Sequence, residues 1–181
     1  MTVELTVPAQ GGRPGLLLRA WAAQDAEALA AEHQDPGMRR WLMTTLDSTA
    51  AAGEWIDQQA QAWETGLRYS FAVVEQDGER PVGHVTVKRK FEGAPSAEIG
   101  YWTAAAVRGR GIAPLAVGAV TRWALGGDAG GPALTRLELL HAVLNTASCR
   151  VAEKSGFTLW GDLEPHPPKF PQAGHIHVCA A

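Results

Sequence analysis

The stretch AAVRGRGIAPLAVGAVTRWAL, residues Ala105–Leu125, places two arginines and two glycines directly before an apolar segment with the character of a helix. If Gly111 caps that helix, the first helical amides have no partner inside it and point beyond its end, where the helix dipole favours an anion. Glycine has no Cβ, so the backbone at Gly109 and Gly111 can approach a phosphate closely. The stretch therefore predicts a phosphate-binding loop.

The flanking residues are consistent with this prediction but do not establish it. Pro114 would lie in the first turn of the helix, where its missing N–H removes no intrahelical bond. Arg108 and Arg110 can add charge-assisted bonds to a phosphate, although an exposed arginine adds little. The alternative is an ordinary glycine-rich helix start with solvated arginines, and the stretch alone does not decide between the two.

Length and composition limit the kind of protein. The chain has 181 residues, of which 46% are hydrophobic and 19% charged, with a formal net charge of -3. These values predict one domain over residues 1–181 and no nucleic-acid partner. The chain has no signal-peptide pattern, no apolar run of membrane-spanning length and only two cysteines. We therefore expect a cytoplasmic protein with reduced thiols and no membrane partner.

The hydrophobic pattern predicts a mixed order of strands and helices. Strands are expected at residues 15–21, 69–76, 80–90, 96–103, 134–140, 157–163 and 174–180. Helices are expected at residues 25–42, with an interruption at 35–37, and at 48–66, 112–125 and 145–156. The turn residues at 77–79 predict a hairpin, so the first half of the sheet should be largely antiparallel.

Polar residues mark the helix ends. Ser48 or Thr49 is the expected N-cap of the second helix. Asn145 is the expected N-cap of the last helix, which should end at Gly156.

Three motifs, in this order along the chain, resemble the GNAT N-acetyltransferase superfamily. AEIGYWT from Ala97 and NTASCRVAEKSGF from Asn145 resemble its RimJ/RimL branch. Between them, R-x-x-G-x-A from Arg108 is similar to the acetyl-CoA motif of the superfamily. The resemblance covers nearly the whole chain and implies an α+β fold of α/β/α layers: a strongly twisted, mixed, largely antiparallel sheet with helices on both faces. Two of its strands would splay apart and admit the pantetheine arm of acetyl-CoA.

The same resemblance implies which residues bind this cofactor. Backbone groups of Tyr101, Trp102 and Thr103 would pair with the pantetheine amides like an added strand. Asn145 would hydrogen-bond the pantetheine chain. The pyrophosphate would be held by the amides of six consecutive residues, Arg108, Gly109, Arg110, Gly111, Ile112 and Ala113.

The implied activity is transfer of an acetyl group from acetyl-CoA to a primary amine, either a protein N-terminal α-amine or the amine of a small molecule. Ser148 would lie near the thioester sulfur, and Glu98 matches the position of the general base in RimL-like enzymes. Each residue also has a plainer interpretation. Asn145 can be only a helix cap, Ser148 can share the hydrogen bonds of that cap, and Glu98 can be a solvated strand residue.

Two histidines near the end of the chain could be metal ligands. His175 and His177 share one face of an expected strand, but the sequence offers no convincing third ligand. We therefore expect no metal. Cys149 follows Ser148 in the chain but points about 100° away from it around a helix, so it is expected to pack rather than to take part in chemistry.

The acceptor side is less defined. Trp41, Trp55 and Trp63 come from the region that forms this side in relatives, and they either line a pocket or pack in the core. Basic residues that could hold an acidic peptide are scattered over two segments, at Arg39, Arg40, Lys88, Arg89 and Lys90. The sequence identifies neither the acceptor nor whether the protein is a monomer or a homodimer.

Two other functions compete with the enzyme. A non-catalytic acyl-CoA-binding module would keep the loop and Asn145 but tolerate loss of Glu98 and Ser148, and the chain retains both. A nucleotide-binding protein of another fold is disfavoured, because the dinucleotide fingerprint needs a glycine where Pro114 stands and the Gly-Lys-Ser/Thr ending of a P-loop is absent.

Overall fold

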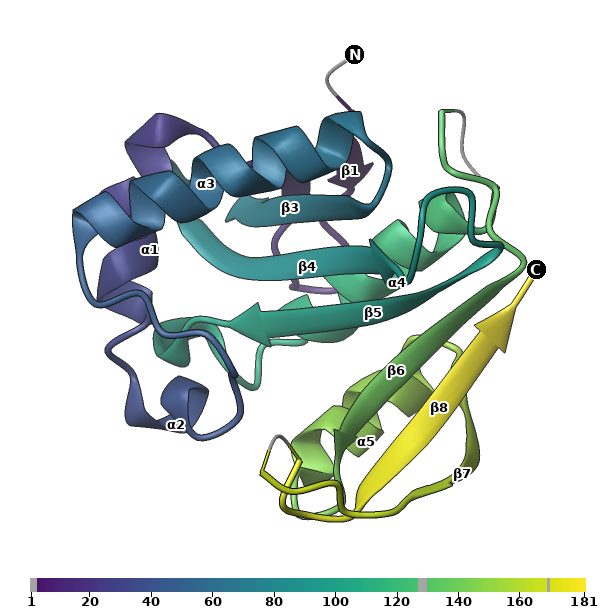
Figure 1. The fold of residues 1–181 in the computed structure, drawn as a ribbon. Coiled ribbons are helices and arrows are strands. Elements are labelled where there is room, and N and C mark those ends of the chain that lie inside the picture. The colour runs from purple at the N-terminus through teal and green to yellow at the C-terminus, as the bar shows by residue number, and fades with distance from the viewer. Residues whose placement is uncertain (1–2, 127–129, 169) are drawn as a thin grey trace.

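A single sheet of eight strands in the order β1-β2-β3-β4-β5-β6-β8-β7 organises the molecule (Figure 1). The structure, a computed structural model, describes residues 3–126, 130–168 and 170–181. The strands are β1 Leu5–Val7, β2 Leu16–Ala20, β3 Arg68–Glu75, β4 Pro81–Arg89, β5 Ser96–Thr103, β6 Arg136–Ala142, β7 Thr158–Leu163 and β8 Gly174–Ala180. The α-helices are α1 Ala26–Glu32, α2 Pro36–Arg39, α3 Thr49–Glu64, α4 Ile112–Ala124 and α5 Thr146–Lys154, and two 3-10 turns are η1 Ala23–Asp25 and η2 Ala105–Val107.

The pairing of β5 with β6 is short and is the one parallel pairing among the described strands. It joins Ser96–Glu98 to Arg136–Glu138 and then stops. Beyond this point β5 continues along β4, whereas β6 continues along β8, and the two strands diverge (Figure 1). The splayed strand pair that the sequence implied is therefore present between β5 and β6.

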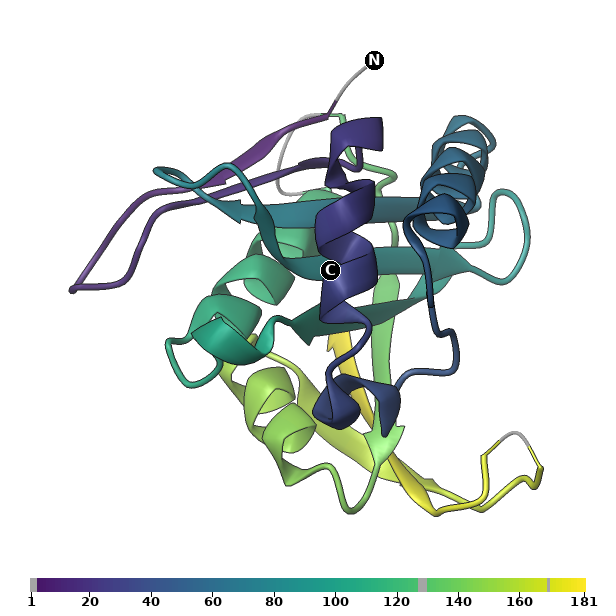
Figure 2. The same cartoon turned by 90° about the vertical axis from the view of Figure 1, so that its left-hand side faces the viewer.

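Helices cover both faces of the sheet (Figure 2). On one face, α1 and α3 pack over a cluster that includes Leu29, Ile56 and Trp102. On the other face, α4 and α5 pack over a larger core that includes Ile99 and Val117. Because side chains alternate along a strand, β5 contributes Ile99 to one cluster and Trp102 to the other.

The structure confirms each predicted strand and the helical segments. Ser48, rather than Thr49, caps α3 by accepting a hydrogen bond from the amide of Ala51 at 3.1 Å. The first predicted helix is divided into η1, α1 and α2, because Asp35 caps a new turn whose first residue is Pro36. Strand β1 was not predicted, since three residues carry too little pattern to detect.

No helix among the described residues is both long enough and apolar enough to cross a membrane.

A buried histidine lies within the cluster under α1 and α3. His84 on β4 is 6% exposed, and its Nδ1 lies 3.1 Å from Nε1 of Trp21. The same Nδ1 also lies 3.1 Å from the carbonyl oxygen of Phe71, so it stands between a donor, the indole N–H, and an acceptor. Burial is the main cause that lowers the pKa of His84 from 6.5 to about 3.

This shift predicts an acid-labile fold. His84 stays neutral in the folded protein but takes up a proton in the unfolded chain below pH 6.5. The free energy of unfolding should therefore fall by about 1.4 kcal/mol per pH unit from this residue as the pH drops from 6.5 towards the folded-state pKa. His84→Gln keeps an acceptor for Trp21 but does not titrate, so urea unfolding of this variant should depend less on pH over that range. An equally steep dependence in both proteins would contradict the assignment.

Candidate active site

The loop before α4 has the backbone geometry that the sequence predicted. Gly109 and Gly111 both have φ of 81°, in the left-handed region that favours glycine. Gly111 is the N-cap of α4 and offers no side-chain acceptor. Among the described residues, no group accepts a hydrogen bond from the amides of Gly109, Gly111, Ile112 or Ala113. The amides of Arg108 and Arg110, which were also expected to be available, instead donate to the carbonyls of Ala105 and Val107, both at 3.4 Å. The loop therefore presents free N–H groups at the positive end of a helix dipole.

The arginines of this loop are engaged elsewhere. Arg108 forms an ion pair with Asp35, and its Nε donates to the carbonyl of Thr103 at 3.3 Å. Arg110 donates two hydrogen bonds, of 2.8 and 3.2 Å, to the two carboxylate oxygens of Glu75. These pairs tie the loop to the start of α2 and to the end of β3. An anion at the loop would consequently meet backbone amides before it meets the arginine side chains.

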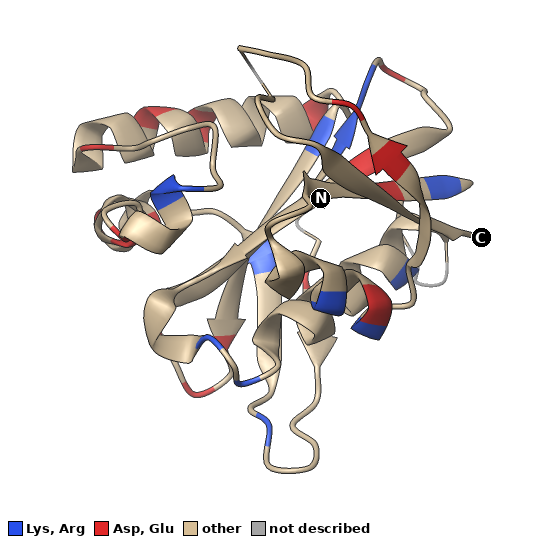
Figure 3. Ribbon diagram, turned by 90° about the horizontal axis from the view of Figure 1, so that it is seen from below, with Lys and Arg blue, Asp and Glu red and all other residues tan. Residues whose placement is uncertain are grey.

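Arg13, which the sequence did not single out, lies beside this loop. It comes from the turn between β1 and β2, and its Nε lies 3.4 Å from the position that a Cβ on Gly111 would take. Within the described parts of the chain, its guanidinium has no carboxylate partner. Figure 3 shows Lys and Arg dispersed over several elements, so this cation is a local feature and not part of a broad basic face. Only the tertiary fold brings it to α4.

The edge of β5 that faces the splay offers backbone groups for a ligand. The amide of Ala104 donates to the carbonyl of Val82, so along β5 the hydrogen-bonding groups of Trp102 also face β4. Those of Tyr101 and Thr103 face the opposite side, where β6 no longer pairs, although the carbonyl of Thr103 already accepts from Nε of Arg108. The three-residue backbone set expected from the sequence is thereby narrowed to Tyr101 and Thr103, while the indole of Trp102 is buried under α1.

A side-chain hydrogen bond spans the splay. The hydroxyl of Tyr101 on β5 donates to Oγ of Ser148 on α5 at 2.9 Å. Burial raises the pKa of Tyr101, so its hydroxyl stays protonated at neutral pH and remains a donor. Because Ser148 accepts from Tyr101, its own proton is free to point towards another acceptor. The tyrosine hydroxyl is a functional group that sequence reasoning missed.

Asn145 caps α5 as predicted. Its Oδ1 accepts a hydrogen bond from the amide of Ser148 at 3.2 Å. Capping uses the oxygen alone, so the side-chain NH2 group is left to bind another acceptor.

Glu98 lies where the splay begins. It is the last residue of β5 that pairs with β6, and it stands opposite Glu138. Its Oε1 accepts from Nζ of Lys88 at 2.6 Å, and its side chain is 43% exposed. Strand alternation places Glu98 on the α1 and α3 face, whereas Tyr101 and Ser148 meet on the α4 and α5 face. At the gap between β5 and β6, Glu98 from one face of the sheet and Ser148 from the other could both reach a bound substrate.

The tryptophans of the second predicted helix pack in two different clusters. Trp55 contacts Trp21 edge-on, with ring centroids 5.7 Å apart. Trp63 contacts Phe71 in the larger core, with centroids 4.9 Å apart. Trp41 stacks under the guanidinium of Arg40 at 4.8 Å. Packing, rather than a shared pocket, accounts for Trp55 and Trp63.

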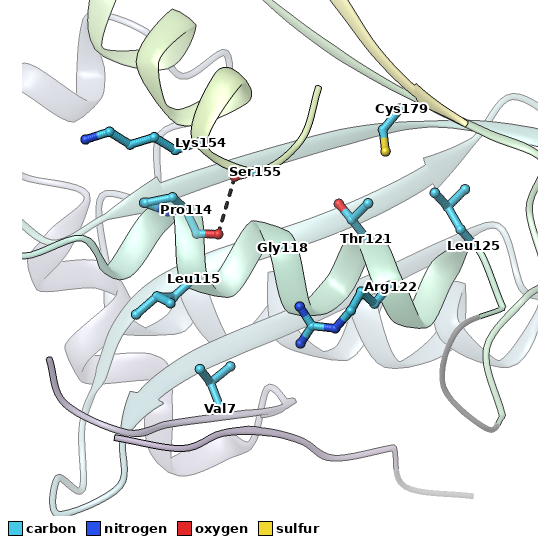
Figure 4. Close-up of a pocket in the computed structure, with 10 residues that line it drawn as sticks. All are labelled: Val7, Pro114, Leu115, Gly118, Thr121, Arg122, Leu125, Lys154, Ser155 and Cys179. Carbon is cyan, nitrogen blue, oxygen red and sulfur yellow. Dashed lines mark hydrogen bonds between the residues drawn. The ribbon is translucent and has the colours of Figure 1, made fainter. Parts of the chain in front are cut away.

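A separate hollow lies away from this site. It has a volume of about 530 Å³ and runs along α4 towards the end of α5 (Figure 4). Its lining includes Pro114, Arg122, Lys154 and Cys179, and Ser155 donates to the carbonyl of Pro114 at 3.3 Å. Neither the free amides of the loop nor the pair across the splay contributes to it.

Comparisons with known proteins agree with this geometry. Residues 15–158 match the family model described as Acetyltransferase (GNAT) domain. No curated protein matches the chain by sequence.

Many solved structures share the fold. Mycobacterium smegmatis RimJ in complex with CoA-disulfide is 25% identical, with a TM-score of 0.77 over 99% of this chain and 87% of that one. The ribosomal-protein-S5-alanine acetyltransferase of Vibrio fischeri is 15% identical, with a TM-score of 0.81 over 97% and 96%. The Microcin C7 self immunity acetyltransferase MccE, in complex with acetyl-CoA and AMP, is 18% identical, with a TM-score of 0.79 over 97% and 98%.

The loop geometry generates a prediction about binding of acetyl-CoA, the ligand expected from the sequence. Gly111→Val should weaken binding about tenfold or more, since it disturbs amides whose bonds to a charged group contribute roughly 1.5–3 kcal/mol. Arg110→Ala should weaken it by no more than about fivefold, because this side chain is exposed and paired with Glu75. Titration calorimetry on both variants measures the difference.

A matched control separates strain from binding. Gly93 also has a positive φ, of 76°, with open space around it. Gly93→Val introduces similar backbone strain and should leave the affinity unchanged. Equal losses in Gly111→Val and Arg110→Ala would show that side-chain charge, rather than the backbone, holds the phosphates.

Proposed function

The chain belongs to the GNAT acetyltransferase family, and on that premise we propose that it transfers an acetyl group from acetyl-CoA to a primary amine within one domain spanning residues 1–181. Family membership identifies it as an acetyltransferase rather than a non-catalytic binding module. The observation that supports acetyl-CoA as the co-substrate is the set of free amides of Gly109, Gly111, Ile112 and Ala113 at the start of α4.

Two features of the chain fit acetyl-CoA. Its pyrophosphate would be held by the loop amides, and Arg13 stands close enough to add a charge. Its pantetheine amides would pair with the open backbone edge of Tyr101 and Thr103, in the manner of an added strand. RimJ and MccE, which share the fold, are solved with CoA-disulfide and with acetyl-CoA.

The residues at the splay would serve the chemical step. Transfer forms a C–N bond, breaks the C–S bond, removes a proton from the amine and leaves negative charge on sulfur. We assign Ser148 to donate a hydrogen bond to that sulfur, with Tyr101 orienting the serine hydroxyl. Glu98, whose charge is balanced by Lys88, would accept the amine proton directly or through water. Much of the acceleration would come from positioning the two substrates.

Weakly basic amines are the acceptors that this arrangement suits. A free α-amine has a pKa of about 7.7–8.0, so on the order of 10% is neutral at pH 7. A lysine side chain, with a pKa near 10.4, needs roughly 4–5 kcal/mol to reach the neutral form. A single carboxylate therefore suffices for a protein N-terminus or a small weakly basic amine, and less readily for lysine. RimL, another structure that shares the fold, is a ribosomal L7/L12 alpha-N-protein acetyltransferase, which supports a protein α-amine as the acceptor.

The setting of the reaction is also part of the proposal. Both cysteines, Cys149 and Cys179, are unpaired, which suits a reducing compartment such as the cytoplasm.

The test of this function is a screen of small amines and N-terminal peptides with acetyl-CoA, detecting the released thiol. We expect thiol release with at least one acceptor and acetylation of its amine by mass spectrometry. Lack of acetyl-CoA binding would refute the co-substrate assignment.

Once an acceptor is found, Ser148→Ala should lower kcat at least about tenfold, because the serine acts on charge that develops only in the transition state. Tyr101→Phe should lower kcat less, roughly two- to tenfold, as expected for one oriented hydrogen bond. The two effects should not add in the double variant, because both act through one hydroxyl. Steady-state kinetics measure kcat, and calorimetry should show nearly unchanged acetyl-CoA affinity. Loss of acetyl-CoA binding in Ser148→Ala would instead assign the serine to the binding site.

Glu98→Gln should lower turnover most at neutral pH, and the defect should shrink as rising pH deprotonates the amine in solution. Lys88→Gln is the matched control, since it removes the ion pair but keeps the carboxylate. Rate profiles between about pH 6 and 9 distinguish the possibilities. Unchanged rates in Glu98→Gln would remove this residue from the mechanism, and an equal loss in Lys88→Gln would assign the effect to the ion pair.

A further inference from the structure

Four side chains with metal-binding atoms converge beneath the first turn of α5. His141 is the second-last residue of β6, His175 and His177 lie on β8, and Cys149 belongs to α5. One nitrogen from each histidine and the sulfur of Cys149 all lie within 4.8 Å of one another. The sequence pointed only to the two histidines of the closing strand, and the fold supplies the third and fourth ligands that were missing.

Each histidine of this cluster has one buried ring nitrogen without a partner among the described residues. Nδ1 of His141 lies 2.9 Å from the carbonyl oxygen of Ala142, so Nδ1 holds the proton and Nε2 keeps a lone pair. That Nε2 is buried, as is Nδ1 of His175, and neither atom has a hydrogen-bond partner among the described residues. On His177, Nε2 lies 3.6 Å from Sγ of Cys149, whereas Nδ1 is buried without a partner in the described part of the chain. A buried polar atom without a partner is destabilising, so the two atoms on His141 and His175 call for an explanation.

The surroundings resemble the outer shell of a metal site. Nε2 of His175 lies 3.6 Å from a carboxylate oxygen of Asp162, which can orient the ring and leave Nδ1 facing the cluster. The Ala142 carbonyl does the same for His141. Burial lowers the pKa of both His141 and His177, which favours the neutral form that binds metals.

We propose that His141, Cys149, His175 and His177 bind a single Zn²⁺ ion in tetrahedral coordination. Three imidazoles and one thiolate form a donor set that suits zinc. Zinc bonds of about 2.0–2.1 Å to nitrogen and 2.3 Å to sulfur separate such ligands by roughly 3.6 Å. Nε2 of His177 already lies 3.6 Å from Sγ of Cys149. The side chains of His141 and His175 need to move only slightly towards these two atoms to complete the tetrahedron.

The site is structural rather than catalytic. All four coordination positions are taken by protein, so no position remains for water or substrate. Strands β6 and β8 are already paired in the sheet, and α5 packs in the core that includes Leu139 and Ala152. The ion would add a direct link between α5 and these two strands. Because Asn145 and Ser148 lie in the same first turn as Cys149, zinc would hold the turn that carries two residues of the proposed active site.

Metal binding by the full chain tests this proposal without reference to activity. The protein is prepared without a histidine tag, stripped with a chelator and titrated with Zn²⁺ by calorimetry and with Co²⁺ by absorption spectroscopy. We expect one ion per chain, the intense visible bands of tetrahedral cobalt and a near-ultraviolet band from a cobalt–thiolate bond. Cys149→Ser should abolish that ultraviolet band and weaken zinc binding at least tenfold. His175→Gln should weaken zinc binding to a similar extent.

Matched controls come from the same chain. Cys179→Ser removes the other thiol, and His166→Gln removes an exposed histidine from the loop before β8. Both should bind zinc and cobalt like the unchanged protein. The cobalt spectrum of the unchanged protein decides the matter even if a ligand variant folds poorly. Absence of a thiolate band, or ligand variants that bind zinc as tightly as the controls, would overturn the proposal.

Discussion

The early end of the pairing between β5 and β6 is the constraint on which the rest of the structure depends. Three residue pairs hold the two strands together, and after Glu98 each follows a different neighbour. The interruption opens the sheet, exposes the backbone edge of Tyr101 and Thr103, and lets α5 approach β5 closely enough for Ser148 to meet the tyrosine hydroxyl. A continuous sheet would bury that edge in hydrogen bonds and leave no passage between the two faces.

The second constraint is the conformation of the loop before α4. Two glycines with positive φ turn the chain at the start of α4, where the amides of Gly111, Ile112 and Ala113 are free, and ion pairs engage Arg108 and Arg110 with Asp35 and Glu75. In the proposed mode of binding, fixed backbone dipoles rather than long side chains would hold the phosphates. Such dipoles lose little conformational entropy when a ligand binds. The ion pairs of Arg108 and Arg110 would serve mainly to hold the loop in place.

Most of the fold could be predicted from sequence because strands and helices carry their own periodicity and caps, as at Ser48 and Asn145. The conformation of the loop at Gly111 could be predicted for the same reason, since it depends on local backbone geometry. The remainder depends on contacts between distant segments. Arg13 reaches α4 across almost a hundred residues of chain, and the Tyr101 hydroxyl meets a serine 47 residues away. The four-ligand cluster unites β6, α5 and β8, and no spacing rule connects His141 to His177.

The central claim is that backbone amides of the loop, with the open edge of β5, hold acetyl-CoA. The most direct measurement is a titration of isotope-labelled protein with acetyl-CoA, followed through the amide resonances by NMR. The account predicts that the largest shifts fall on the amides of Gly109, Gly111, Ile112 and Ala113 and on those of Tyr101 and Thr103, while the amide of Trp102, which faces β4, changes less. Saturable binding that leaves these loop amides unshifted would contradict it.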